Sequence, residues 1–277
     1  MYVAVDIGGS NIRIGAFEEP DKIIKSAVFK VGEDFDASIK KIVNEIKKLS
    51  NGGKIDGIGV CVPGSVDTNK GIIIDAGNLA GWNNKPLRKT LEAVFKTKII
   101  LAHDVVCAAL GEATVGHGQN LDRFTFLIWG TGFGGATVEK IADKFKIKQI
   151  EPGHQIIEAN GPKCTCGQNG CLEAYIGGWA LEKNHGKDYS KIGDDQWEQI
   201  AQKAAQGIIN LTLINPAPVL IFGGGVVSKQ PHLLDRIRKM LEEKQKVFKK
   251  PEFKLSQKGE DVSLFGCRAL FLEKLIS

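Results

Sequence analysis

One histidine and three closely spaced cysteines have the residue types and spacing of a metal site. Cys164, Cys166 and Cys171 fall within eight positions, and His154 lies ten residues before the first of them. Two glycines inside the loop allow it to fold back, so that three thiolates and one imidazole can converge on one ion. The set predicts a tetrahedral zinc site with three cysteine ligands and one histidine ligand. Because protein atoms would fill all four positions, we expect the zinc to shape the loop and not to catalyse.

The zinc loop has an alternative interpretation, a disulfide between two of its cysteines with the third left as a thiol. Nothing else in the sequence indicates an oxidising compartment, so zinc is favoured. A zinc-held loop would place two flanking acids, Glu151 and Glu173. The other three cysteines, Cys61, Cys107 and Cys267, stand alone among apolar residues, and we interpret them as core residues.

Three glycine-rich corners follow strand-like segments and are suited to hold phosphate. In the first, Gly8 and Gly9 separate two alternating apolar runs, a pattern typical of two antiparallel strands joined by a tight turn. Backbone N–H groups without side chains around them can approach an anion, and Asp6 can hold a metal ion directly or through water. The other corners are 130–135 and 223–225. Alone, the first corner could be an ordinary surface turn, but the three together fit a phosphate chain held from two sides.

The second corner has another possible meaning, because Gly130, Gly132 and Gly135 match the G-x-G-x-x-G pattern of dinucleotide-binding proteins. Glu151 then lies near the place of a ribose-binding acid. That motif requires a helix after its last glycine, whereas residues 136–139 have the character of a strand. The sequence therefore favours a phosphate corner over a hydride-transfer enzyme. A P-loop is excluded, because G-x-x-x-x-G-K-[ST] does not occur.

The elements that must position these residues alternate between strands and helices. The expected strands are 3–7, 12–17, 23–31, 57–62, 98–102, 124–129, 136–139 and 219–222, and the expected helices are 35–49, 105–113, 196–214, a run from about 231, and 264–276. Both halves open with a strand, a glycine corner and a strand. This repetition predicts two related α/β lobes with a ligand between them.

Composition and charge exclude several classes of function. The 277 residues carry 37 basic and 32 acidic side chains, and the net charge of +5 is dispersed. The densest basic cluster, 236–250, alternates with apolar and acidic residues, which indicates the solvated face of a helix and not a nucleic-acid site. No stretch reaches the ~18 apolar residues that a membrane span requires, and the chain opens with a strand and not a signal peptide. We expect a cytoplasmic protein that binds neither nucleic acid nor membrane.

Together these motifs resemble the ROK family of sugar kinases, and the resemblance covers nearly the whole chain. The motifs that carry it are Asp6-Ile7-Gly8-Gly9-Ser10, Val62-Pro63-Gly64, Asn78-Leu79-Ala80-Gly81-Trp82, Asp104 ahead of Ala108–Ala113, Gly130–Gly135, Glu151-Pro152-Gly153-His154, the cysteine loop and Gly223–Val226. The resemblance implies an α/β fold of the two-lobed, actin-like (hexokinase/ribonuclease H-like) ATPase type. The small lobe would be 1–110, with a C-terminal helix at about 264–277 packed on it. The large lobe would be 111–263 and carry the zinc-bound loop.

The same resemblance implies a role for each site residue. Asp104 would be the catalytic base, because a sugar hydroxyl is a poor nucleophile until a carboxylate accepts its proton. By itself, an aspartate between a strand and a helix is more typical of an N-cap. The implied sugar-binding residues are Gly64, Asn78, His103, Asp104, Glu151, His154 and Glu173. The implied ATP and Mg²⁺ residues are Asp6, Gly8, Gly9, Ser10, Asn11, Thr131, Gly132, Gly224 and Gly225, and the implied zinc ligands are His154, Cys164, Cys166 and Cys171.

The expected activity is ATP-dependent phosphorylation of a hexose. The 6-hydroxyl of glucose is the first candidate for the acceptor, and N-acetylglucosamine, N-acetylmannosamine and fructose are alternative substrates. Polyphosphate is an alternative donor, and the family favours homodimers. A sugar-sensing regulator is the alternative of another class, but family repressors carry a DNA-binding segment ahead of the first hairpin, which here begins at the second residue. An ATPase with an iron–sulfur cluster is a third alternative.

Two positions depart from the family pattern. His103 stands where the family usually has the asparagine that touches the sugar, which bears on substrate identity and on Asp104. Pro152 replaces a residue that is usually not proline.

Overall fold

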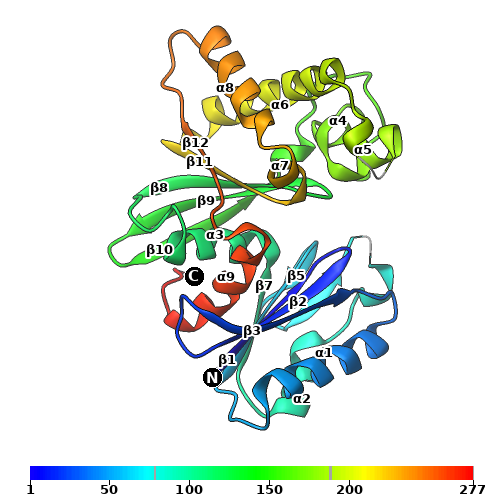
Figure 1. Cartoon of the computed structure of the whole chain (residues 1–277), viewed down its shortest axis with the longest axis vertical. Coiled ribbons are helices and arrows are strands. Elements are labelled where there is room, and N and C mark those ends of the chain that lie inside the picture. Colours follow the sequence, from blue (N-terminus) through cyan, green and yellow to red (C-terminus); the bar gives the residue numbers. More distant parts are fainter. Residues whose placement is uncertain (78, 187–188, 277) are drawn as a thin grey trace. The chain divides into compact units, whose positions relative to one another are not determined.

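The computed structural model describes residues 1–77, 79–186 and 189–276, and it divides into two compact units. Unit 1 consists of Met1–Asn120, Lys140–Ile147 and Asp261–Ser277, and unit 2 consists of Leu121–Glu139 and Lys148–Glu260. The described residues form two five-stranded sheets (Figure 1). Within the described part of the chain, no helix combines the length and apolar character that a membrane crossing needs.

The sheet of unit 1 has the strand order β3-β2-β1-β4-β7. Its strands are β1 (Tyr2–Ile7), β2 (Asn11–Phe17), β3 (Ile23–Lys30), β4 (Gly57–Val62) and β7 (Ile99–His103). β1 and β2 pair antiparallel, which confirms the hairpin expected around the first glycine corner, and β4 runs parallel to both β1 and β7. A separate pair is formed by β5 (Ser65–Asp67) and β6 (Ile72–Asp75). The parallel strands bring their carboxyl ends to one edge, where open sheets bind ligands.

Helices cover both faces of this sheet (Figure 1). They are α1 (Phe35–Ser50), α2 (Leu87–Phe95), α3 (Asp104–Val115) and α9 (Val262–Ala269), and a 3₁₀ turn, η1, spans Ala80–Trp82. Val3 and Val5 of β1 pack with α1 and α2, whereas Ala4 between them packs with α3 and α9. This division follows from the alternation of side chains along a strand.

The C-terminal helix is shorter than expected. α9 ends at Ala269, a 3₁₀ turn, η5 (Leu270–Leu272), follows, and Glu273 adopts a left-handed conformation. The next residues pair with Phe145, whose N–H donates to the carbonyl of Lys274 and whose carbonyl accepts from the N–H of Ile276. The expectation of a helix to residue 276 was therefore wrong, because strand-like pairing satisfies these backbone groups instead.

The second sheet, most of which belongs to unit 2, has the strand order β10-β9-β8-β11-β12. Its strands are β8 (Arg123–Trp129), β9 (Phe133–Ile141), β10 (Lys144–Ile150), β11 (Val219–Gly223) and β12 (Glu252–Leu255). β8 pairs antiparallel with β9 and parallel with β11. The second glycine corner therefore joins two strands, and this rules out the dinucleotide-binding interpretation, which needs a helix there.

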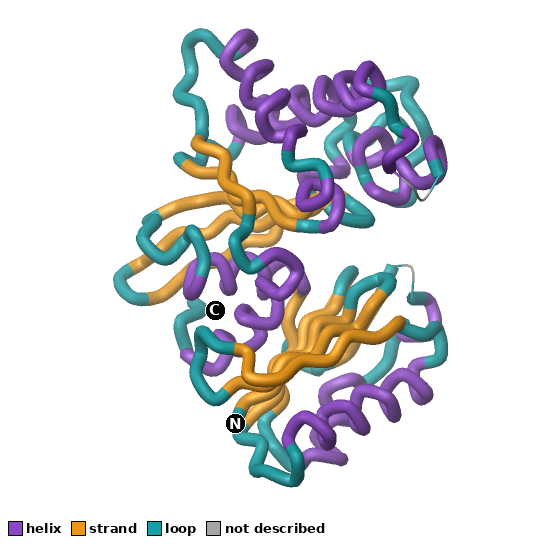
Figure 2. Tube along the Cα trace, in the orientation of Figure 1, coloured by secondary structure: helices purple, strands orange, loops and turns teal. Residues whose placement is uncertain are grey.

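The helices of unit 2 lie to one side of its sheet (Figure 2). They are α4 (Glu173–Ile176), α5 (Gly178–His185), α6 (Asp194–Ile214), α7 (Gly225–Lys229) and α8 (His232–Lys244), with 3₁₀ turns at η2 (Pro152–His154), η3 (Tyr189–Lys191) and η4 (Gly259–Asp261). In α6, Ile200, Ala204 and Ile208 recur at helical spacing and pack on Leu220 and Phe222 of β11. The core of the unit therefore lies between these helices and the sheet.

Candidate functional site

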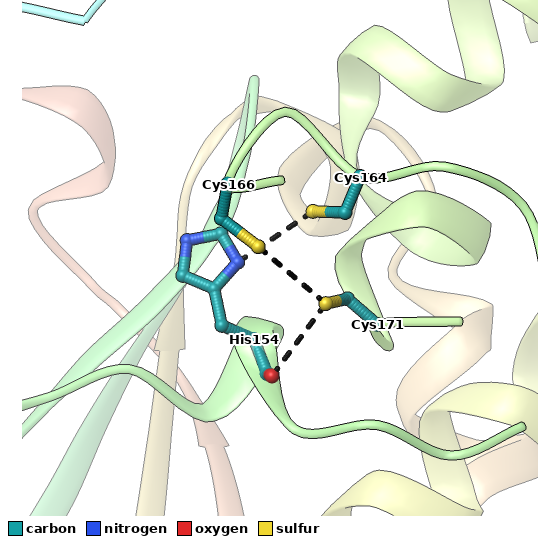
Figure 3. Close-up of side chains that lie close together, drawn as sticks. All are labelled: His154, Cys164, Cys166 and Cys171. Atoms are coloured by element: carbon teal, nitrogen blue, oxygen red, sulfur yellow. Dashed lines mark hydrogen bonds between the residues drawn. The ribbon is translucent and has the colours of Figure 1, made fainter. Parts of the chain in front are cut away.

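The four expected zinc ligands converge in unit 2 (Figure 3). The ligand atoms of His154, Cys164, Cys166 and Cys171 all lie within 4.8 Å of one another. Cys166 Sγ is 3.6 Å from Cys171 Sγ, and Cys164 Sγ is 3.7 Å from Nδ1 of His154. Zinc–sulfur bonds of ~2.3 Å in a tetrahedron place two sulfurs ~3.8 Å apart. The donor set and its spacing therefore fit a structural zinc ion, and the six cysteines are free thiols without a disulfide.

Local backbone geometry explains why the loop closes. The N–H of Cys164 donates to the carbonyl of Gln168 at 2.8 Å. Gly170 has φ +70°, and a Cβ there would lie 1.6 Å from the carbonyl oxygen of Glu158. A residue other than glycine cannot occupy this position without moving the loop. A hydrogen bond from the backbone N–H of Gln168 lowers the pKa of Cys166 to about 7, whereas burial raises the pKa of Cys171 to about 12.

Glu173 connects the cysteine loop to the second glycine corner. It begins α4 two residues after Cys171 and is only 8% exposed. Its Oε2 accepts from the backbone N–H of Phe133 at 2.8 Å, and its Oε1 accepts from Nε1 of Trp179 at 3.0 Å. A Cβ at position 132 would lie 2.5 Å from Oε2, so Gly132 leaves the space that the carboxylate fills. Each oxygen of the carboxylate therefore accepts one hydrogen bond and keeps further lone pairs for a ligand.

The other acid that flanks the loop, Glu151, is exposed and precedes the η2 turn. Its Oε1 accepts from Nε2 of Gln149 at 2.6 Å, and its carbonyl accepts from the N–H of His154. A Cβ at Gly153 would lie 2.2 Å from the carbonyl oxygen of Phe133. The turn that carries Glu151 and His154 therefore packs directly on the strand that leaves the second corner.

The second and third glycine corners adjoin each other within unit 2. The N–H of Gly178 donates to the carbonyl of Gly130 and the N–H of Trp179 donates to that of Thr131, both at 2.9 Å. The N atom of Gly225 lies 3.9 Å from the Cβ position of Gly130. Gly224 has φ +99°, which glycine adopts without strain. The expected residues Thr131, Gly132, Gly224 and Gly225 thus belong to one region of unit 2.

In unit 1, Asp6 ends the first strand before the glycine corner and is 7% exposed. The thiol of Cys61 donates to its Oδ1 at 3.3 Å, and Nη1 of Arg13 lies 3.9 Å from its Oδ2. Burial, together with the nearby Cys61 and Asp104, raises the pKa of Asp6 well above its usual value. A cation bound beside Asp6 would favour its ionised form. At the corner itself, the N–H of Gly8 donates to the carbonyl of Asn11 at 2.9 Å, and Gly9 and Ser10 are exposed.

Asp104 is the first residue of α3, directly after β7. Its Oδ1 accepts from the N–H of Val105 at 2.6 Å, and Nδ1 of His103 lies 2.9 Å from the same oxygen. Nδ1 is also 3.2 Å from the N atom of Val105. When Nδ1 carries a proton it donates to Asp104, and when it does not it accepts from Val105. The residue that departs from the family pattern is therefore in direct contact with the expected base.

Of the remaining expected residues, Gly64 has φ +79°, and a Cβ there would lie 2.1 Å from the carbonyl oxygen of Asp75. Asn78 lies outside the described residues. Two contacts were not expected from the sequence: Trp179 as a donor to Glu173, and Cys61 as a donor to Asp6. Cys61 is the neighbour of Asp6 in the parallel pairing of β1 and β4, and only the strand order reveals this.

Comparison with known proteins gives a match to the ROK family over residues 2–274. A glucokinase of Thermotoga maritima is 32% identical over 194 residues, which are 68% of this chain and 61% of that protein. An N-acetyl-D-glucosamine kinase of Vibrio atlanticus is 32% identical over 196 residues, 66% of this chain and 65% of that protein. The chain thus spans slightly less than two thirds of the length of these relatives.

Solved structures are similar over almost the entire chain. A ROK hexokinase from Thermus thermophilus has a TM-score of 0.79 and 25% identity, with 98% of each chain covered. A ROK glucokinase from Streptomyces griseus, in complex with glucose and AMPPNP, has a TM-score of 0.81 and 24% identity over 97% of this chain and 98% of that one. The expected two-lobed, actin-like α/β fold is confirmed.

Proposed function

We propose, from the premise that the chain belongs to the ROK family, that it transfers a phosphoryl group from ATP to a hydroxyl group of a hexose. The 6-hydroxyl of glucose is the first candidate, because the relatives include a glucokinase and the Streptomyces griseus structure contains glucose and AMPPNP. N-acetylglucosamine is the next candidate, since another relative is an N-acetyl-D-glucosamine kinase. N-acetylmannosamine and fructose stay in the panel of substrates to be tested.

The observation that carries the proposal is the position of Asp104 at the start of α3. The N–H of Val105 holds Oδ1 at 2.6 Å, so the carboxylate has a fixed orientation at the carboxyl end of β7. As the general base, it accepts the proton of the sugar hydroxyl while the hydroxyl oxygen attacks the γ-phosphorus and the bond to ADP breaks. His103 contacts the same oxygen, and we assign it the role of orienting the base as well as contacting the sugar.

We assign nucleotide binding to the glycine corners. In unit 1, Asp6 would hold Mg²⁺, and Gly8, Gly9, Ser10 and Asn11 would face the phosphates. In unit 2, the nucleotide contacts would come from Thr131, Gly132, Gly224 and Gly225. A bound Mg²⁺ ion would neutralise the negative charge that develops on the phosphate groups during transfer. The backbone donors supply further stabilisation without side chains that could collide with the nucleotide.

We assign recognition of the sugar in unit 2 to Glu151, His154 and Glu173, and in unit 1 to Gly64 and Asn78. The two oxygens of Glu173 are fixed by Phe133 and Trp179, so its remaining lone pairs have set directions for sugar hydroxyls. A zinc ion held by His154, Cys164, Cys166 and Cys171 would lock the loop between Glu151 and Glu173. Since Nδ1 of His154 is the nitrogen close to Cys164, Nε2 is the one assigned to the sugar.

The experiment is a coupled assay of ADP release with ATP, Mg²⁺ and a panel of hexoses and N-acetylhexosamines, repeated with polyphosphate as donor. The wild-type chain is expected to release ADP only when a sugar acceptor is present. The variant Asp104→Asn is the matched control, because it keeps the shape of the side chain. Sugar-independent ATP hydrolysis, or sugar binding without turnover as in a sensing regulator, would contradict the proposal. We also expect a homodimer, which light scattering on the purified chain would test.

A further inference from the structure

The three cysteines that stand alone in the sequence and were expected to be core residues form a cluster in unit 1. Cys61 lies in β4, Cys107 in α3 and Cys267 in α9. Their sulfur atoms all lie within 4.8 Å of one another, and each of the three residues is 0% exposed. The expectation that they are core residues is confirmed, and their proximity to one another was not predicted. The packing of one strand and two helices brings these thiols together, although Cys61 and Cys267 are 206 residues apart in the sequence.

Glycines keep the backbones around the cluster at close approach. A Cβ at Gly59 would lie 2.2 Å from the carbonyl oxygen of Cys267, and a Cβ at Gly266 would lie 1.7 Å from that of Cys107. The strand and both helices therefore touch through their main chains at this place. With so little room for movement, the three sulfurs are held near one another before any ligand arrives.

The donor set consists of sulfur alone. Asp6 accepts from Cys61 at 3.3 Å, yet its carboxylate does not belong to the group of ligand atoms that are mutually within 4.8 Å. Among the described residues, no histidine or acid completes that group. Zinc sites usually have four ligands, whereas a soft cation such as Cu(I) is selected by thiolates. Metal–sulfur bonds of about 2.3 Å would place three sulfurs around one ion about 4 Å apart, inside the observed limit.

We propose that Cys61, Cys107 and Cys267 bind one Cu(I) ion in a three-sulfur site that is separate from the zinc loop. Each thiol that becomes a thiolate ligand releases its proton to solvent, and the positive ion offsets part of the negative charge that the thiolates bring into the core.

Binding also has a consequence for Asp6. The thiol of Cys61 donates to Oδ1 of Asp6, and a Cu(I)-bound thiolate has no proton to donate. Asp6 then exchanges a hydrogen-bond donor for a negatively charged neighbour. We therefore expect Cu(I) to lower kinase turnover. This last consequence rests on the proposed function, whereas the metal site itself does not.

The site is tested by titrating the full-length, zinc-loaded chain with Cu(I) under anaerobic conditions, in competition with a chromogenic Cu(I) chelator. A zinc indicator in the same cuvette reports any zinc that is released. We expect one Cu(I) per chain with the zinc retained, and X-ray absorption showing a coordination shell of three sulfurs. No Cu(I) uptake, or uptake only with an equal release of zinc, would overturn the proposal. A count of two missing thiols before titration would indicate a disulfide and would overturn it as well.

Substitutions of single cysteines test whether these residues bind the Cu(I) ion. Cys107→Ala and Cys267→Ala, on different helices, should each lose the Cu(I) uptake. Thermal melts followed by circular dichroism show which variant is folded, and one folded variant is sufficient. The matched control is Cys166→Ala in the zinc loop, which should lose zinc and keep Cu(I). Uptake that persists in a folded core variant contradicts the site. If the wild-type chain phosphorylates no sugar, the proposed function fails while the stoichiometry of Cu(I) still tests this site.

Discussion

The contacts of Glu173 allow a quantitative prediction for the variant Glu173→Gln. The Glu173 residue is 8% exposed, and its carboxylate accepts from two N–H donors, the backbone N–H of Phe133 and the indole N–H of Trp179. Glutamine has the same shape, but only one of its terminal atoms accepts a hydrogen bond. Whichever way the amide is oriented, one N–H donor then faces an NH₂ group in a buried place.

The expected cost is the loss of one hydrogen bond to a charged group, about 1.5–3 kcal/mol of folding stability. For a unit of this size, such a loss lowers the melting temperature by roughly 3–10 °C. The measurement is thermal unfolding of the zinc-loaded chain, with zinc content checked in each sample. A matched control is Glu151→Gln, because Glu151 is exposed and its change should stay within about 0.5 kcal/mol.

The reasoning about Glu173 would be refuted by a Glu173→Gln variant that melts at the wild-type temperature with its zinc in place. Equal losses in both variants would also refute it, because burial and the paired donors would then not be the cause. A loss confined to Glu173→Gln, accompanied by a higher KM for the sugar, is the result expected if the fixed carboxylate also contacts the sugar.

Three further predictions follow from the same contacts. Asp104→Asn should lower turnover by about 10²–10⁴-fold, the usual contribution of a general base, with sugar affinity retained in calorimetry; near wild-type turnover would remove Asp104 from that role. Burial raises the pKa of Asp6, so the folded state loses stability as the pH rises through that pKa and the buried carboxyl group ionises. Without Mg²⁺, Asp6→Asn should therefore melt at a higher temperature than the wild type at neutral pH, and it should show no such gain below the ordinary aspartate pKa of 3.8. The same variant should bind Mg-ATP poorly. A lower melting temperature at neutral pH would contradict this. Removal of zinc with a chelator should lower both the melting temperature and the affinity for the sugar, and added zinc should restore them; a chain that contains no zinc when purified and is unchanged by chelation would contradict the zinc assignment.

Local pattern was sufficient to predict the strands around the first two glycine corners and the cysteine loop. The alternating apolar runs around Gly8 and Gly9 have the period of strands, and β1 and β2 pair as that period indicates. The strand after the second corner was predicted from residues 136–139, and β9 contains them. The cysteine loop was predicted from spacing within one short segment, because its ligands are close in sequence and its glycines permit the turn.

Contacts between segments distant in sequence were beyond such reasoning. The link between Cys61 and Asp6 depends on β4 being the parallel neighbour of β1, and the three-cysteine cluster depends on the packing of α3 against α9. The early end of α9 has the same origin, since residues 274–276 pair with Phe145, more than 100 residues earlier in the chain. Each of these features is decided by tertiary packing, which residue periodicity does not report.

The measurement that tests the central claim most directly is mass spectrometry of the sugar product formed by the purified chain with Mg-ATP and the hexose panel. We predict a hexose 6-phosphate, formed in equal amount to ADP by the wild type and nearly absent with Asp104→Asn. ADP without a phosphorylated sugar, or the same amount of sugar phosphate from Asp104→Asn, would contradict the assignment of this chain as a sugar kinase with Asp104 as its base.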